Sequence, residues 1–358
     1  MLLRTANQRF ATTDTKPRVY AGFARWAPSV EPRLRIGEVP PHRPHPPYRR
    51  LGRIVHNGCM PILLSSDQWR AQARAHTERA RAYTEPFRQR RARQQTHPIY
   101  DFLFTYYSFP PAQLERWHAG PGVVLLGDDA VAERSGWRFY TVVEDADGRG
   151  TRGVTVDAAE FVEARERMVD FADTIFSSVA AKPGSFSCFG LHEWAMAYKS
   201  EENGVRHDYV PLRLGSTGTD EVVETHQIRC THFDAFRFYA PQARGLNQFT
   251  PTREKQVALE QPGCLHAGMD VYKWLYKLAP LVDSGLIMDA FELAWDTRIM
   301  DMQASPYDLS GWGFEPIRIE TPDGKAEYVE QQRGFSERSQ QLRQRGLDAV
   351  AAIRAAAG

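Results

Sequence analysis

The chain is organised around the segment EQPGCLHAGMDVYKWLYKLAP, residues 260–280. Pro262 and Pro280 bound it, because proline interrupts helical hydrogen bonding, and about four helical turns fit between them. Apolar residues recur there at intervals of three and four: Leu265, Met269, Tyr272 and Tyr276. This periodicity predicts an amphipathic helix. Since His266 and Asp270 are four residues apart, both should project from one face of that helix.

The composition is that of a globular protein without a membrane span. Of 358 residues, 42% are hydrophobic and 25% are charged, which is ordinary for a folded domain. No apolar run approaches the roughly 18 residues of a membrane-spanning helix, and the N-terminus lacks the apolar region of a secretory signal. Four cysteines are too few for a disulfide scaffold of this length. We therefore expect a cytoplasmic protein with no membrane partner.

The net charge of +1 hides an uneven distribution. Residues 1–59 contain eleven Lys/Arg against three Asp/Glu, so the rest of the chain carries −7. This Pro/Arg-rich segment has no apolar periodicity, which predicts disorder. A mis-called gene start before Met60 and a basic arm for nucleic acid are the alternative interpretations. Residues 60–94 carry +5, which leaves −12 for 95–358 and argues against tight nonspecific binding of nucleic acid by that part.

The sequence pattern predicts one predominantly helical catalytic domain over residues 60–358. Ser65 or Ser66 can cap an Arg-rich helix that Pro86 ends or kinks. Other segments are assigned by periodicity: a helix in THPIYDFLFTYYSFPP, hairpins over 120–154, a helix over 157–182, extended structure over 209–230, a helix from Ser284 and a final helix from about Lys325. The expected fold class is mainly α (α+β), a single helical domain with a small antiparallel sheet.

Histidines recur close to acidic residues in four places: His97 with Asp101, His192 with Glu193, His232 with Asp234, and His266 with Asp270. A cysteine precedes three of them closely: Cys188, Cys230 and Cys264. Imidazole, carboxylate and thiolate are ligands of Zn and Fe. The candidate metal ligands are His192, His232 and His266, with Asp270 or Asp234 completing the shell. Cysteines buried as small hydrophobic residues are the alternative.

The same residues suit acid–base catalysis. Beside a metal, Glu193 or Asp101 can act as general base; without one, Asp270 or Asp101 can activate water next to a histidine. Aromatic residues that can wall a pocket for a flat ring are Tyr106, Tyr107, Trp194, Tyr272 and Trp274. The alternative for each ring is a place in the ordinary core.

Several strings in the sequence resemble a known bacterial family. They are HPIYDFLFTYYS, CFGLHEWAMAY, VVETHQIRCTHFDAFRFY and EQPGCLHAGMDVYKWLYKLAP, followed by ASPYDL. Over about residues 60–340 the chain is similar to proteins identified as 3-methyladenine DNA glycosylases. The resemblance implies a base-excision N-glycosylase that acts on an alkylated purine in DNA. Such an enzyme stacks the extruded base between aromatic rings, while a carboxylate stabilises the cationic sugar or activates water.

Two other functions remain open. One is a metal-dependent hydrolase or oxygenase that uses Zn or Fe and acts on a small molecule, including one that contains a nucleobase. The other is a noncatalytic structural protein, in which the His–carboxylate pairs only satisfy buried polarity. The first of these requires that His192, His232 and His266 meet in one cleft.

Overall fold

The computed structural model describes residues 61–358, all of which belong to one compact unit. The predictions for residues 1–59, disorder or a mis-called gene start, lie outside the described residues. Within the described part the chain is mainly helical and contains one small sheet, which confirms the expected fold class. No helix in this part is both long enough and apolar enough to cross a membrane.

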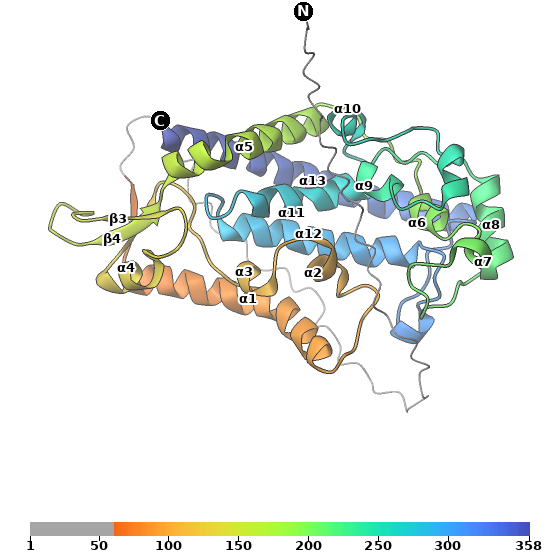
Figure 1. The fold of residues 1–358 in the computed structure, drawn as a ribbon, viewed down its shortest axis with the longest axis horizontal. Helices are drawn as coiled ribbons and strands as arrows, with labels where there is room; N and C mark the ends of the chain where they lie inside the picture. Colours follow the sequence, from red (N-terminus) through yellow and green to blue (C-terminus); the bar gives the residue numbers. More distant parts are fainter. Residues whose placement is uncertain (1–60) are drawn as a thin grey trace, which may run out of the picture. The chain divides into compact units, whose positions relative to one another are not determined.

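Five long helices form the framework: α1 (Ser66–Ala92), α5 (Ala158–Ala180), α11 (Leu265–Lys277), α12 (Ser284–Gln303) and α13 (Pro322–Ala357). In Figure 1, α5 and α13 run side by side along one side of α11 and α12, and α1 lies on the other side of α12. The helix predicted within residues 260–280 is therefore confirmed, and it is central.

The core between these helices explains their sequences. Met269 and Leu275 of α11 pack with Phe291 of α12 and Phe176 of α5, and all four side chains are buried. Each large apolar side chain removed from water contributes about 2–3 kcal/mol before entropy is counted. Buried residues occur on nearly every face of α12, because α1, α11 and α13 all contact it.

Helix ends follow local sequence signals. The Ser65 hydroxyl accepts the Gln68 N–H and the Gln68 side chain accepts the Ser65 N–H, so a capping box starts α1. The helix continues through Pro86 to Ala92, so this proline does not end it. The cap of α12 is Asp283 rather than the predicted Ser284, because the Asp283 carboxylate accepts the N–H groups of the first turn.

The sheet has strand order β1-β2-β4-β3 within the described residues: β1 (Ile62–Leu64), β2 (Val123–Leu126), β4 (Gly153–Val156) and β3 (Tyr140–Val143). The β2–β4 and β3–β4 pairs are antiparallel, as expected for the hairpin region. The β1–β2 pair is parallel, which the sequence pattern did not predict. Three residues are too few to show strand alternation, and α1 supplies the crossover that a parallel pair needs.

The extended structure predicted for residues 209–230 is wrong. Residues Gly215–Thr225 form α8, and Phe233–Phe236 form the short helix α9. β-Branched residues suggested a strand, but Thr219, Val222 and Val223 are buried at helical spacing, and the two valines pack in a second core cluster around Trp194. His232 precedes α9 and Asp234 lies within its first turn.

The remaining elements are short: α2 (Phe102–Tyr106), α3 (Pro111–Leu114), α4 (Asp128–Arg134), α6 (Leu191–Met196), α7 (Ser200–Asn203), η1 (Pro241–Leu246), α10 (Gln256–Leu259) and η2 (Ser310–Trp312). The sheet lies near one end of the long helices, and α6, α7 and α8 lie near the other (Figure 1).

Candidate metal centre and adjoining charged cluster

Three helices bring His192, His266 and Asp301 together. His192 lies in α6, His266 in the first turn of α11 and Asp301 near the end of α12. One ligand atom from each lies within 4.8 Å of the others. The His192 Nε2 to Asp301 Oδ1 distance is 3.0 Å, and the two imidazole centroids are 4.5 Å apart. We call this group the metal triad.

The turn before α6 depends on a glycine. Gly190 has a φ of +66°, in the left-handed region that residues with a Cβ avoid. A Cβ at this position would also lie 3.3 Å from the Tyr328 ring and 3.5 Å from Ala304. Glycine therefore permits both the backbone turn and the close approach that set the direction of His192.

Two atoms of the metal triad face each other without a hydrogen bond. His192 Nε2 and Asp301 Oδ1 are buried and, among the described residues, neither has a hydrogen-bond partner. Their separation is short enough, but their directions do not satisfy the angular requirement. Leaving a buried polar atom unpaired costs about 1–3 kcal/mol. The 3.0 Å contact between them is therefore an ion pair when His192 is protonated, and the two atoms are close enough to bind one cation when it is not.

Arg298 and Glu193 hold the Asp301 carboxylate from the other side. Arg298 Nη1 donates to Asp301 Oδ2 at 3.3 Å and to Glu193 Oε1 at 2.7 Å, and all three side chains are buried. Burial alone would raise the pKa of Asp301, but His192 outweighs it and holds that pKa well below its usual range. Burial lowers the pKa of His266 to about 3, which keeps this imidazole neutral and able to bind a metal.

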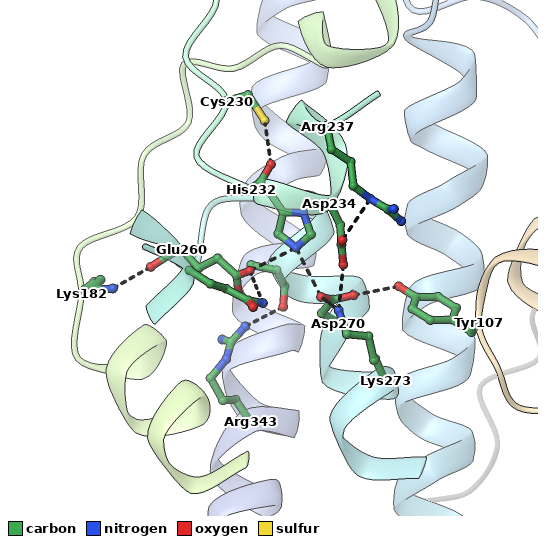
Figure 2. Close-up of polar contacts among 12 residues, drawn as sticks. Tyr107, Lys182, Cys230, His232, Asp234, Arg237, Glu260, Asp270, Lys273 and Arg343 are labelled. Atoms are coloured by element: carbon green, nitrogen blue, oxygen red, sulfur yellow. Dashed lines mark hydrogen bonds and ion pairs between the residues drawn. The ribbon is translucent and has the colours of Figure 1, made fainter. Parts of the chain in front are cut away.

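A second cluster adjoins the metal triad (Figure 2). His232 Nε2 lies 3.2 Å from Glu260 Oε1 and 3.3 Å from Asp270 Oδ2. The Lys273 ammonium lies 2.5 Å from the same Asp270 oxygen, and Tyr107 donates its hydroxyl to Asp270 Oδ1 at 3.1 Å. We call His232, Glu260, Asp270 and Lys273 the charged cluster.

The two carboxyl groups of the charged cluster have pKa values shifted in opposite directions. Burial would raise the pKa of the Asp270 carboxyl, but Lys273 and His232 hold it well below its usual range. Burial raises the pKa of Glu260, and the neighbouring carboxylates outweigh burial to raise the pKa of His232. Asp270 is therefore the ionised carboxylate of the cluster, and the Lys273 ammonium is its counter-ion.

His266 joins the two groups. Its ring centroid is 4.5 Å from that of His192 and 5.3 Å from that of His232, on which it stacks at 29°. The structure therefore brings together the three histidines chosen from the sequence. Only two of them share a group with Asp301; His232 belongs to the charged cluster.

The carboxylates chosen from the sequence are placed differently from expectation. Asp234 belongs to neither group of possible metal ligands; it pairs with Arg237 at 3.2 Å and with Lys273 at 3.1 Å. Asp101 is not beside the metal triad: its carboxylate binds Arg90 and accepts the His97 N–H at the start of α2. Glu193 positions Arg298 and makes no contact with His266 that would suit a base there.

The aromatic candidates divide into two sets. Tyr107 contacts Asp270, and Tyr106 packs edge-on against Tyr107, so both border the charged cluster. Trp194 donates to the Ala304 carbonyl inside the second core cluster. Tyr272 and Trp274 belong to the main core. Trp194, Tyr272 and Trp274 do not line a pocket, because neighbouring side chains cover them.

Sequence reasoning missed Asp301, Glu260 and Lys273. Asp301 follows Arg298 by three residues in DTRIMD, and that spacing resembles an exposed helical ion pair. In the structure Arg298 and Asp301 are buried, because other elements cover α12 on several faces. The i, i+3 spacing of Asp270 and Lys273 was a usable signal for the cluster.

A small cavity reaches the metal triad. It has a volume of about 10 Å³, room for roughly one water molecule. His192 and His266 line it together with three thiols, Cys188, Cys230 and Cys264. Burial raises the pKa of each thiol, so these cysteines are neutral.

Comparison with protein-family models, curated proteins and solved structures gives no match to this chain.

Proposed function

We propose that this chain is a metal-dependent enzyme, a hydrolase or oxygenase, which binds one Zn²⁺ or Fe²⁺ ion through His192, His266 and Asp301. The observation that carries the proposal is the gathering of one ligand atom each from His192, His266 and Asp301 within 4.8 Å of one another, where His192 Nε2 and Asp301 Oδ1 are buried and make no hydrogen bond of regular geometry. Two histidines and one carboxylate form the ligand set of mononuclear Fe(II) oxygenases and of some Zn hydrolases. Such an ion supplies Lewis acidity and an activated water or oxygen.

The charges of the site can accommodate a cation. Burial alone would lower the pKa of His192, but Asp301 outweighs it and raises that pKa, so without an ion a protonated His192 and Arg298 balance Asp301 and Glu193. A metal ligand must be a neutral imidazole, so a divalent cation would take the place of the proton on His192. Arg298 would orient Asp301 through its second oxygen, as residues around metal ligands commonly do.

The chain's own residues also provide a means of proton movement. His232 stacks on His266 and lies within contact distance of Glu260 and Asp270, so a proton on Nε2 can be shared with either carboxylate. The neutral thiols restrict the adjoining cavity to about one water molecule, which favours a small reactant at the triad.

Elemental analysis of the full chain purified without added metal tests this proposal. We expect close to one equivalent of Zn or Fe in the wild type and loss of most of it in His192→Ala and in Asp301→Asn. His226→Ala is the control, because His226 lies outside both clusters and bonds the Val222 carbonyl. The proposal is refuted by metal-free wild type under both aerobic and anaerobic purification, or by folded Asp301→Asn that retains the full metal content.

An N-glycosylase acting on alkylated purine in DNA is the second candidate. The observation that favours it is the ionised, buried Asp270 with Tyr107 and Tyr106 beside it, a carboxylate next to aromatic rings. Release of free base from alkylated DNA, abolished by Asp270→Asn and retained by the surface variant Asp348→Asn, would support it. Base release that is equal in both variants, or absent from the wild type, excludes it. If metal and base release are both absent, the noncatalytic alternative stands.

A further inference from the structure

A cavity of about 500 Å³ lies between the end of α1 and the segment that follows α2. Its volume falls in the range of small-molecule sites. It is lined by Phe87, Arg88, Arg91, Phe104, Tyr107 and Phe109, among others. None of the proposed metal ligands contributes to it, so it is distinct from the metal triad.

The walls of this cavity present fixed flat rings. Phe87 and Phe104 stack with centroids 4.7 Å apart at 28°, and Phe109 stacks on Tyr276 at 4.8 Å and 19°. Phe87 and Tyr107 are almost fully buried, whereas Phe104 and Phe109 are half-buried and present the more accessible ring surface. Rings immobilised by such packing favour a planar partner, which can lie against them at little entropic cost.

The polar part of the lining is cationic. Arg88 and Arg91 are its charged residues, and no acidic side chain of the described chain lines the cavity. Arg88 is fixed by Glu115, with Nη1 and Oε1 2.6 Å apart. Arg91 is exposed and lies 5.8 Å from the Phe87 ring centroid; no carboxylate of residues 61–358 is within ion-pair distance of it. Arg91 is therefore available to an anion.

We propose that this cavity binds a small planar aromatic molecule carrying a phosphate or carboxylate group. The ring lies against the Phe87 and Phe104 side, and Arg91 holds the anionic group by charge-assisted hydrogen bonds. Tyr107, another lining residue, connects the cavity to the charged cluster, because its hydroxyl donates to Asp270. The site stands whether or not the metal triad is a metal site.

Calorimetric titration of the full chain with phenyl phosphate and with benzoate tests the inference. We expect saturable binding at one site, about tenfold or more tighter than that of phenol or inorganic phosphate, because only the complete ligand uses both ring and charge. The stronger of the two aromatic anions identifies the anionic group.

Arg91→Ala and Arg93→Ala form a matched pair. Both residues are exposed at the same end of α1, but Arg93 does not line the cavity. We expect Arg91→Ala to weaken binding by about tenfold and Arg93→Ala to leave it nearly unchanged. Equal weakening in both variants would show diffuse attraction to a basic helix end and overturn the inference. So would phenyl phosphate or benzoate binding no better than phosphate and phenol.

Discussion

Replacement of Lys273 by methionine is the most direct test of the charged cluster. The Lys273 ammonium lies 2.5 Å from Asp270 and 3.1 Å from Asp234, and its side chain is only 13% exposed. Methionine keeps the apolar length of the side chain but removes the charge. The Asp270 carboxylate would then be buried with the Tyr107 hydroxyl and with His232, which it shares with Glu260.

The size of the expected destabilisation depends on whether Asp270 stays ionised or takes up a proton in the variant. Removing one partner of a buried ion pair costs about 3–5 kcal/mol. Asp270 can limit the loss by taking up a proton, which at pH 7 costs about 4 kcal/mol from an unfolded pKa of about 3.9. We therefore expect Lys273→Met to lower the free energy of unfolding by about 3 kcal/mol at pH 7.

The pH dependence has a defined sign. In Lys273→Met the folded-state pKa of Asp270 rises above its unfolded value, so its contribution to stability is present at low pH and is lost as pH rises. The cost of protonating Asp270 is the upper limit on the loss of unfolding free energy relative to wild type. This limit falls from about 4 kcal/mol at pH 7 to about 1.5 kcal/mol at pH 5. Urea unfolding at both pH values measures this change.

Lys277→Met is the matched control. Lys273 and Lys277 both lie over the Trp274 ring, at 4.8 and 4.7 Å, but no carboxylate of the described residues pairs with Lys277. We expect a change below about 1 kcal/mol for this variant. Asp270→Asn combined with Lys273→Met should recover most of the loss. A Lys273→Met deficit that matches the Lys277→Met deficit, or that is the same at pH 5 and pH 7, would refute the reasoning.

Three further outcomes are expected. Gly346→Ala should destabilise the fold by about 1–3 kcal/mol, because the added Cβ would lie 2.8 Å from the buried Phe176 ring. Gly334→Ala in the same helix meets nothing within 4 Å and should stabilise the fold by about 0.5–1 kcal/mol. Chemical denaturation of the two variants measures both changes in unfolding free energy. Burial lowers the pKa of His97 to about 3, so stability should decline as pH falls below about 6.5; His97→Asn retains an acceptor for the two backbone N–H groups and should reduce the loss measured at pH 4. Chelator dialysis should lower the Tm of the wild type but leave that of His192→Ala unchanged, since a ligand that binds only the folded state stabilises it.

Local sequence was sufficient for much of the architecture. The helices α5 and α11 were located from apolar spacing, α13 from its Arg/Gln/Ala-rich composition, and the start of α1 from a serine cap at Ser65 or Ser66. Prediction failed where composition and tertiary packing disagree. The segment that forms α8 is rich in β-branched residues, yet Val222 and Val223 are held at helical spacing by the second core cluster. Strand β1 was missed because its only evidence is its partner β2.

The sequence alone determined that the chain is mainly helical and that His192, His232 and His266 were the histidines to examine. It determined this because periodicity and side-chain chemistry are properties of short segments. Only the tertiary structure decided which carboxylate each histidine meets. Asp301 joins His192 and His266, and Asp270 joins His232 and Lys273, because α12 is covered on several sides and α11 directs consecutive turns toward different neighbours. Such pairings depend on contacts between residues up to about a hundred positions apart, which no local pattern records.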